Sequence, residues 1–327
     1  MKAAVCDRYG PPDVVVIREV PPIRPGPGDV LVRVGASSVT TGDWRMRSAA
    51  FPGITWLPGR LMFGIRKPRK GVLGGDFAGT VEAVGAGVTG FAPGDRVFGF
   101  SGVGAHAEAV AVKATGAIAP TPENLTDVEA AAVPFGALSA LVFLRDFAKV
   151  RPGHRVLLIG ASGGVGCYAT QIARHLGATV DAVCGPDNRD LVQTLGADHV
   201  FDHTRDDMTA TTRRYDVIMD IVGVSDFARC RPILTGTGVF VPLNFGSLGE
   251  IAQALWTARR AGQRMVLGTS GEKQQDLKEI ADLLRSGAIR PVVDRILPFA
   301  EIADAHAYVE KRRRRGGVVL SMDALAA

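Results

Sequence analysis

The chain has 327 residues, of which 46% are hydrophobic and 22% are charged, and its formal net charge is +5 at pH 7. These values are typical of globular proteins and exclude wholesale disorder. At about 150 residues per domain, the length suggests two domains. No apolar run reaches the roughly 18 residues of a membrane span, and no secretory segment follows the start. We therefore expect a cytoplasmic protein with no membrane partner.

Glycine and proline are more frequent than usual, with 40 and 19 residues. They lack a Gly-X-Y period and are spread through apolar sequence, which excludes collagen and low-complexity tracts. Tight turns, or backbone packed closely on a ligand, would explain them. The four cysteines lie far apart without a Cys-x-x-Cys pair, so neither a zinc knuckle nor a disulfide framework is predicted.

A dense basic run occupies residues 311–315, directly before Gly316 and Gly317. A nucleic-acid patch could have this composition. The end of a helix, with cations in its last turn and a glycine cap, could have it too. We favour the helix end because the net charge is modest, and we expect no nucleic-acid partner.

The N-terminal third of the chain consists of short β-type runs separated by Gly/Pro turns, which predicts a compact β domain. The runs are residues 14–20, 30–34, 79–84, 97–100 and 107–112. Residues 51–72 interrupt this rhythm with aromatic, basic, Gly and Pro residues. They are interpreted as a mobile loop over a site or as a surface insertion.

Helical spacing begins after Thr126, a predicted N-cap, and covers residues 127–147. The apolar run 156–159 is typical of a parallel strand buried on both faces. Further helices are predicted at 164–176, 187–195, 226–234, 248–261 and 273–286, and strands at 180–183, 200–201, 217–219, 239–241 and 265–267. This alternation predicts an α/β fold with a doubly wound parallel sheet. We expect the last strands, 292–293 and 318–320, to rejoin the first domain.

The glycine-rich segment from Gly160 to Gly166 follows the apolar run 156–159 and precedes a predicted helix. In this context it matches the dinucleotide fingerprint, in which a tight glycine turn brings backbone N–H groups to a pyrophosphate. The predicted contacts are Ser162, Gly163, Gly164 and Val165.

The same letters also satisfy Gly-x-Ser-x-Gly, the nucleophile elbow of α/β-hydrolases, with Asp220 and His306 as later acid and base. A hydrolase needs several parallel strands before its elbow, whereas the preceding half here is turn-rich and β-like. His306 also lies in an expected surface helix, where an exposed histidine is ordinary. We therefore favour dinucleotide binding.

The end of the second predicted strand bears on the choice of dinucleotide. NAD-binding proteins place an acid there for the ribose 2′-hydroxyl, but this strand ends in Cys184, and Asp181 lies too early in it. Gly185, Asn188 and Arg189 leave room and one positive charge for a 2′-phosphate. We predict NADPH, with NADH possible because Asp187 is close by.

Six separated motifs follow one another along nearly the whole chain. They are Met1-Lys2-Ala3; residues 28–34 with 36–39; Gly74-Gly75-Asp76-Phe77-Ala78-Gly79; Gly94-Asp95-Arg96-Val97-Phe98-Gly99; the turn from Gly160 to Gly166; and Leu195-Gly196-Ala197-Asp198 with residues 216–220. With these motifs the chain resembles the medium-chain dehydrogenase/reductase superfamily, and within it the zinc-independent quinone oxidoreductase-like branch. The resemblance implies a GroES-like catalytic domain (1–118 and 265–327), a Rossmann domain (119–264), an active site in the cleft separating them and a homodimer.

Departures from the zinc-dependent relatives bear on the chemistry. Those relatives carry Cys near Thr40 and Gly-His-Glu where Gly74, Gly75 and Asp76 stand, and a cluster of four cysteines that is missing here. Without a Lewis acid, alcohol oxidation is disfavoured. The resemblance thus implies hydride transfer to quinones or α,β-unsaturated carbonyls. Alternatives are a zinc-free alcohol or carbonyl dehydrogenase and a silent nucleotide-binding protein.

The resemblance also suggests polar residues for the site. Thr40 could donate to a substrate oxygen or end a strand, and Asp43 could supply a proton or begin a helix. Ser139 matches a helix residue near the nicotinamide, and Asn244 could reach the carboxamide or cap the next helix. An apolar substrate pocket could be lined by Trp44, Phe51, Trp56 and Phe63.

Overall fold

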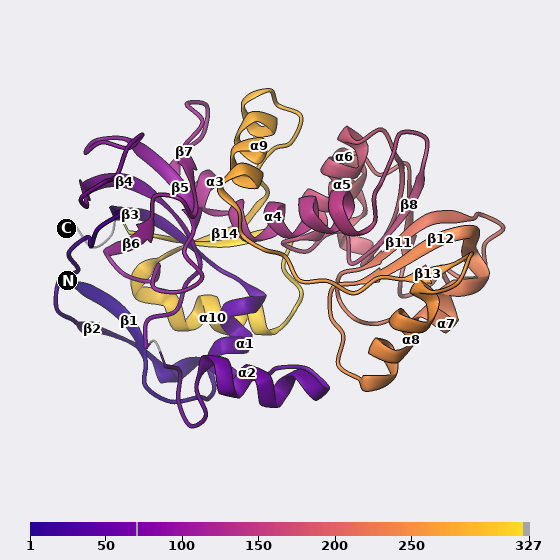
Figure 1. The fold of residues 1–327 in the computed structure, drawn as a ribbon, viewed down its shortest axis with the longest axis horizontal. Coiled ribbons are helices and arrows are strands. Elements are labelled where there is room, and N and C mark those ends of the chain that lie inside the picture. The colour runs from indigo at the N-terminus through magenta and orange to yellow at the C-terminus, as the bar shows by residue number, and fades with distance from the viewer. Residues whose placement is uncertain (70, 323–327) are drawn as a thin grey trace. The chain divides into compact units, whose positions relative to one another are not determined.

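The computed structural model describes residues 1–69 and 71–322 and forms two compact units (Figure 1). The first unit comprises Met1–Phe51, Trp56–Leu138 and Glu272–Ala327, and the second comprises Pro52–Thr55 and Ser139–Gly271. Both ends of the chain thus contribute to the first unit. The domain boundaries inferred from the sequence, after residues 118 and 264, stay a prediction.

The first unit is built on a seven-stranded sheet with the order β14-β15-β3-β4-β5-β7, in which β6 also pairs with β3. Its pairs are antiparallel except β14 with β15. The strands are β3 (Asp29–Val39), β4 (Asp76–Val84), β5 (Arg96–Phe100), β6 (Ala109–Lys113), β7 (Ala117–Pro120), β14 (Val293–Pro298) and β15 (Gly317–Ser321). A separate antiparallel pair joins β1 (Lys2–Cys6) to β2 (Val15–Glu19). The last strands rejoin the first domain as predicted.

Helices pack on this sheet, and two of them, α1 (Thr41–Ser48) and α3 (Asp127–Ala131), begin at capping boxes. Further helices are α2 (Trp56–Phe63), α4 (Pro134–Val142, which continues into the second unit), α9 (Gln274–Arg285) and α10 (Ile302–Glu310). Thr126 forms a capping box with Glu129, as predicted. The single helix predicted over 127–147 is wrong, because α4 restarts at Pro134, whose ring disfavours helical backbone in the residue before it. A π-helical turn at Phe143–Phe147 then follows α4.

Two segments with open sequence interpretations contain structure that the sequence did not predict. Residues 51–72 contain the helix α2, held by stacking of the Phe51 and Phe63 rings with centroids 5.6 Å apart. The basic run lies after α10 rather than in its last turn, because Arg312 adopts a left-handed φ of 56°. In that run, Arg314 donates to the Thr41 hydroxyl at 2.8 Å.

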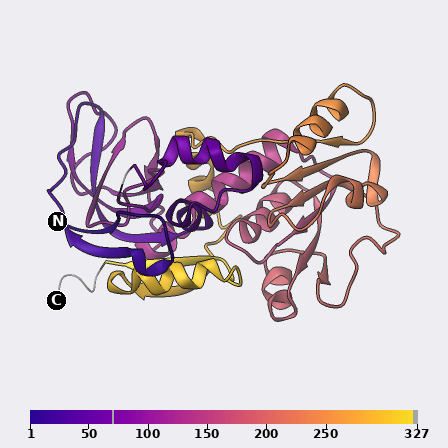
Figure 2. The ribbon, with the colours of Figure 1, turned by 90° about the horizontal axis from the view of Figure 1, so that it is seen from below.

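His306 is buried, which corrects the expectation of an exposed surface histidine. Its ring packs edge-on against the buried His106 ring, with centroids 5.7 Å apart. The helix α10 that carries it lies along α1 and the N-terminal strands (Figures 1 and 2), so its inner face points into the first unit. Burial lowers the pKa of His306 well below its ordinary value and keeps the ring neutral.

The second unit is a six-stranded parallel sheet with the order β10-β9-β8-β11-β12-β13. Its strands are β8 (Arg155–Ile159), β9 (Thr179–Cys184), β10 (His199–Asp202), β11 (Tyr215–Asp220), β12 (Leu234–Pro242) and β13 (Arg264–Met265). Its helices are α5 (Gly166–His175), α6 (Arg189–Thr194), α7 (Phe227–Cys230) and α8 (Leu248–Ala258). Taken in chain order, the strands follow the Rossmann order 3-2-1-4-5-6.

Helices cover both faces of this parallel sheet. Figures 1 and 2 show α5 and α6 on one face and α7 and α8 on the other. The core between them is apolar, with Leu157, Ile218 and Phe240 at most 1% exposed. Parallel strands buried on both faces need such continuous apolar runs. The strand order reverses between β8 and β11, so the carboxyl ends of these two strands mark the place where ligands bind in such sheets.

Candidate active site

The turn after β8 depends on glycine at two positions. Gly160 has a left-handed φ of 88°, and a Cβ there would lie 2.6 Å from Val222 Cγ1. A Cβ on Gly166 would lie 2.2 Å from the Gly160 carbonyl oxygen, so only glycine lets α5 start this close to the strand. At Gly163, by contrast, the nearest atom would be 3.7 Å away. The space above Gly163 is therefore open to a ligand.

The neighbouring strand β11 ends at the same edge of the parallel sheet as β8. The Asp220 carboxylate, at the end of β11, accepts hydrogen bonds from the four backbone N–H groups of residues 222–225 at 2.8 to 3.1 Å. These bonds hold the loop whose residue Ile221 accepts from the Asn244 amide at 3.1 Å. Ser247, and not Asn244, caps α8. The capping alternative for Asn244 is therefore wrong.

Residues at the end of β9 lie beside the glycine turn. Asn188 donates from Nδ2 to the Ser162 hydroxyl at 3.0 Å, so two of the predicted cofactor residues are brought together. Gly185 follows Cys184, and a Cβ on it would lie 3.6 Å from Nε2 of His203. His203 follows β10, and sequence reasoning missed it because only the strand order places it next to β9.

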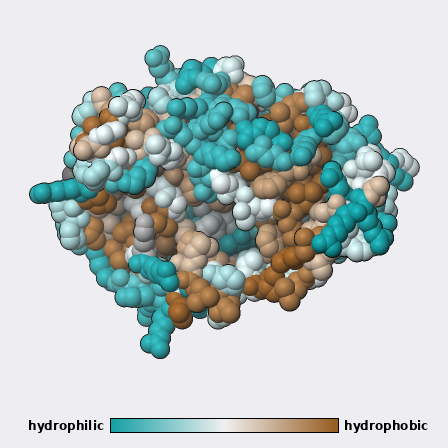
Figure 3. Space-filling model, viewed as in Figure 1, coloured by the Kyte–Doolittle hydropathy of each residue, from teal (hydrophilic) through white to brown (hydrophobic). Residues whose placement is uncertain are grey.

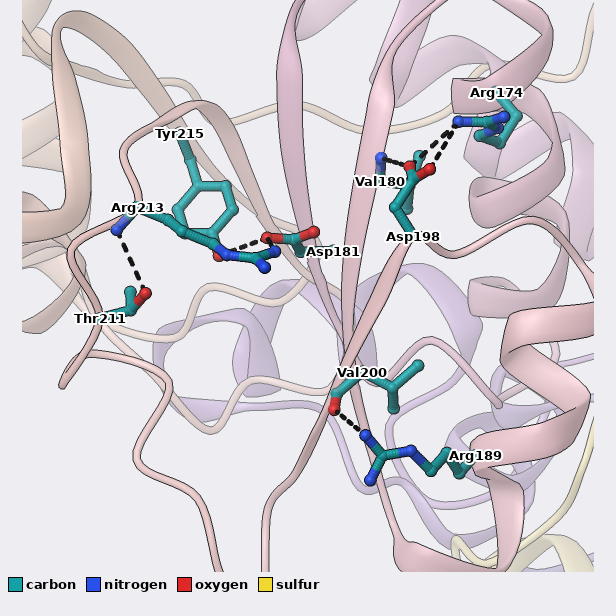
Figure 4. A network of polar contacts seen from close by, with 9 residues as sticks. All are labelled: Arg174, Val180, Asp181, Arg189, Asp198, Val200, Thr211, Arg213 and Tyr215. Atoms are coloured by element: carbon teal, nitrogen blue, oxygen red, sulfur yellow. Dashed lines mark hydrogen bonds and ion pairs between the residues drawn. The ribbon is translucent and has the colours of Figure 1, made fainter.

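Asp181 is engaged elsewhere, as expected from its early position in β9. Its Oδ2 accepts from the Tyr215 hydroxyl at 2.8 Å and from Arg213 Nη1 at 2.7 Å. Figure 4 shows this cluster apart from Arg189, which donates to the Val200 carbonyl at 3.3 Å. The Asp181 carboxylate is thus bound to Tyr215 and Arg213 and does not point to the end of β9, where a ribose would bind.

In the first unit, Asp43 organises the end of β3 and the start of α1. Its Oδ2 accepts from the Thr40 amide at 2.7 Å and the Thr40 hydroxyl at 2.6 Å. Its Oδ1 accepts from the Gly74 amide at 3.0 Å. The helix-start interpretation of Asp43 is therefore confirmed as a capping box. The Thr40 hydroxyl proton points at Asp43, so donation to a substrate oxygen would require this bond to open.

Asp76 is a second buried carboxyl next to this cap, at the start of β4. It accepts from the Ser38 hydroxyl at 2.6 Å and from the Phe135 amide at 2.8 Å. Desolvation raises the pKa of Asp76 to about 8, the hydrogen bonds to Ser38 and Phe135 oppose the rise, and the charge of Asp43 adds to it. The side chain is therefore mostly protonated at neutral pH. Its motif was noticed in the sequence, but its burial was not predictable.

Position 75 has no room for a metal ligand. A Cβ on Gly75 would lie 2.3 Å from Cε2 of Phe100, so the aromatic ring fills the space that a histidine would need. Within residues 1–69 and 71–322, no group of three His, Cys, Asp or Glu side chains could hold a metal ion. A zinc ligand at position 75 therefore does not fit beside Phe100.

The remaining predicted residues are distributed over both units. Ser139 is buried on α4, at the first residue of the second unit. Trp44 packs against the core of the first unit, whereas Trp56 is 48% exposed. Phe51 and Phe63 stack on each other. Of the four residues predicted to line the substrate pocket, Phe51 and Phe63 are thus in direct contact.

Comparisons with known proteins agree with this architecture. Residues 26–123 match the family described as "Alcohol dehydrogenase GroES-like domain", and residues 195–320 match "Zinc-binding dehydrogenase". The chain is 32% identical to the mitochondrial NAD(P)H oxidoreductase RTN4IP1 of Mus musculus, over 98% of this chain and 89% of that protein. It is 30% identical to a quinone oxidoreductase of Pseudomonas aeruginosa, over 95% and 97%.

Two further relatives extend the comparison. A 2-methylene-furan-3-one reductase of Solanum lycopersicum is 31% identical, over 98% of this chain and 79% of that protein. The solved quinone oxidoreductase of Coxiella burnetii superposes with a TM-score of 0.86 at 27% identity, over 98% and 99%. The chain therefore belongs to the medium-chain dehydrogenase/reductase superfamily, in its quinone oxidoreductase-like branch. It is an NAD(P)H-dependent oxidoreductase with a Rossmann sheet and a GroES-like domain.

None of the helices within residues 1–69 and 71–322 is long and apolar enough to cross a membrane.

The raised pKa of Asp76 predicts a pH-dependent stability. As pH rises from about 4 to about 8, the unfolded chain has lost this proton while the folded chain keeps it, so the free energy of unfolding decreases. An Asp76→Asn variant keeps an acceptor for Phe135 but does not titrate. It should lose a slope of up to about 1.4 kcal/mol per pH unit, measured by urea unfolding. The exposed Asp304→Asn is the control, and equal slopes in the wild type and Asp76→Asn would contradict the assignment.

Proposed function

We propose that the protein transfers hydride from NADPH to quinones or to activated C=C bonds, without zinc. The observation that carries this proposal is the Phe100 ring at the place of a metal ligand next to Gly75. Without a Lewis acid, the acceptor must already be electrophilic. Quinones and α,β-unsaturated carbonyls have this property. The names of the bacterial quinone oxidoreductase and the plant 2-methylene-furan-3-one reductase support the same substrate classes.

In this proposal the residues of the second unit hold the cofactor, which supplies a hydride when bound. Backbone groups of Ser162, Gly163, Gly164 and Val165 bind the pyrophosphate at the start of α5. Open space at Gly163 and the close approach at Gly166 support this binding. Asn244 reaches the carboxamide, and Ser139 lies near the nicotinamide.

The first unit receives the substrate in this proposal. In the proposed reaction the bond from the Thr40 hydroxyl to Asp43 opens, and the hydroxyl donates to the substrate oxygen that becomes negative, which favours the developing enolate. A proton arrives from a side chain or from water. The pocket is lined by Trp44, Phe51, Trp56 and Phe63. We further propose that the enzyme is a homodimer in the cytoplasm, where its four buried free cysteines remain reduced.

The test of the activity is a scan of acceptors with NADPH and NADH. Quinones and enones should be reduced, with loss of the cofactor absorbance, and chelators should not change the rate. Turnover of aldehydes or alcohols instead would favour the zinc-free dehydrogenase. Cofactor binding without any turnover would favour a silent nucleotide-binding protein.

The preference for NADPH depends on the groups at the end of β9. Arg189 and His203 can meet a 2′-phosphate, whereas Asp181 is occupied by Arg213. An Arg189→Ala variant should raise the Kd of NADPH about tenfold, the value of one charge-assisted hydrogen bond, and leave the Kd of NADH unchanged. Isothermal titration measures both constants. Arg174→Ala, which breaks an ion pair with Asp198 in the same unit, is the control. An equal effect on both dinucleotides would contradict a phosphate contact.

The glycine turn is tested at the position where a side chain fits the protein but not the cofactor. A Gly163→Val variant has open space in the protein, so it should fold with an unchanged Tm. It should nevertheless bind NADPH about a hundredfold more weakly, because the pyrophosphate must approach this backbone closely. Gly236→Val is the matched control, because a Cβ there meets nothing within 4 Å, and a Cβ on Gly163 meets only the Gly160 carbonyl oxygen at 3.7 Å. Unchanged affinity of Gly163→Val would refute the placement of the pyrophosphate.

A further inference from the structure

The helix α2 and the loop after it form an unusual surface on the first unit. Five large apolar side chains are each between 48% and 63% exposed: Trp56, Leu57, Leu61, Met62 and Ile65. The exposed cations Arg66, Lys67 and Arg69 follow directly. We call these eight residues the α2 surface. A contiguous apolar patch rimmed by charge is characteristic of an interaction site.

The α2 surface is held in place by contacts on its inner side. Gly59 lies against the Phe51 ring, which stacks on Phe63. The Tyr9 hydroxyl donates to the Gly64 carbonyl at 2.6 Å, and the Arg69 amide donates to the Phe63 carbonyl at 2.7 Å. The helix therefore has a packed aromatic side and an opposite apolar side that faces solvent. The exposed apolar side chains of α2 thus belong to a helix whose opposite side is packed against the first unit.

The pictures show this arrangement on the molecule. In Figure 3, hydrophobic residues gather over α2, and hydrophilic residues project beside them. In Figure 2, seen from below, α2 lies at the front of the first unit. No other element of that unit covers it there.

All charged residues in the segment 44–75, which contains the α2 surface, are positive. Between Asp43 and Asp76 the sequence holds seven arginines and lysines and no acidic residue. Since the net charge of the whole chain is +5, the remainder of the chain is slightly negative. Three of these cations, Arg66, Lys67 and Arg69, are exposed on the α2 surface. Arg45 and Arg47 lie on α1 instead, where Arg47 is fully buried and pairs with Glu310. The α2 surface thus carries exposed positive charge beside its apolar side chains, which favours a partner that is negative and apolar at once.

We propose that the α2 surface docks on the face of an anionic lipid bilayer. A short helix with Trp, Leu and Met on one side and cations beside them suits the boundary between headgroups and acyl chains. Each Lys or Arg near an anionic leaflet strengthens binding about fivefold. A second copy of the chain would bring the same cations face to face and repel. The bilayer would be touched from one side and not crossed, so the expectation of no membrane partner is revised by this proposal.

Trp56 belongs both to the α2 surface and to the proposed substrate pocket, but Met62, Arg66 and Lys67 do not, so variants of these three residues test the docking independently of the acceptor. The test uses the full-length protein and sedimentation with two kinds of vesicle, phosphatidylcholine alone and phosphatidylcholine mixed with phosphatidylserine. The protein should sediment with the mixed vesicles and not with phosphatidylcholine alone. About 1 M NaCl, which shortens the Debye length to about 3 Å, should release most of it.

Two variants separate the apolar and charged contributions. Met62→Glu and the double variant Arg66→Glu/Lys67→Glu should each lower the partition to mixed vesicles about tenfold. The matched control is Ile296→Glu, since Ile296 is 59% exposed on β14 of the same unit. It should bind vesicles like the wild type, and all variants should keep their Tm.

Three results would overturn the proposal. The first is equal binding to both kinds of vesicle, and the second is equal binding by Met62→Glu and Ile296→Glu. The third is a lower molecular mass of Met62→Glu in size-exclusion chromatography with unchanged vesicle binding, which would assign the α2 surface to a contact between copies.

Discussion

The close approach of α5 to the end of β8 is the contact on which the second unit depends. A Cβ on Gly166 would lie 2.2 Å from the Gly160 carbonyl oxygen, so this helix can start where it does only because residue 166 has no side chain. The approach brings the start of α5 to the point where the strand order reverses. Nearby, the hydrogen bonds to Asp220 hold the loop after β11. The proposed cofactor site follows from this geometry, because the start of α5 and the open space at Gly163 lie together at the end of β8.

Two buried carboxyl groups have a comparable role in the first unit. Asp43 joins the cap of α1 to the Gly74 amide, and Asp76 joins β3 to the start of α4 through Ser38 and Phe135. These side chains stand in and around the segment where zinc-dependent relatives carry ligands. Here they satisfy backbone amides instead, and Phe100 occupies the remaining space. The same framework that holds a metal in relatives is thus stabilised by hydrogen bonds and an aromatic ring.

Local sequence signals predicted the elements that depend on local interactions. The cap at Thr126, the buried strand β8 and the glycine turn all appear where they were expected, because each is determined by neighbours within a few residues. Predictions failed where a distant residue decides. His306, which was expected on a surface helix, is buried and packs against His106, two hundred residues earlier in the chain. The pairing of Asp181 with Arg213 could not be read from their separation in the sequence.

The sequence by itself determined the superfamily, the two-domain architecture and the class of cofactor, because ordered glycine and apolar motifs encode a parallel sheet and its phosphate-binding turn. Only the tertiary structure decided which polar groups are already occupied. Thr40 donates to Asp43, Asp76 lies buried with a raised pKa, and His203 reaches the end of β9. It also decided that the apolar residues of α2 face solvent. Hydrogen-bond partners and burial are properties of chain segments that meet only after folding, so no local pattern can specify them.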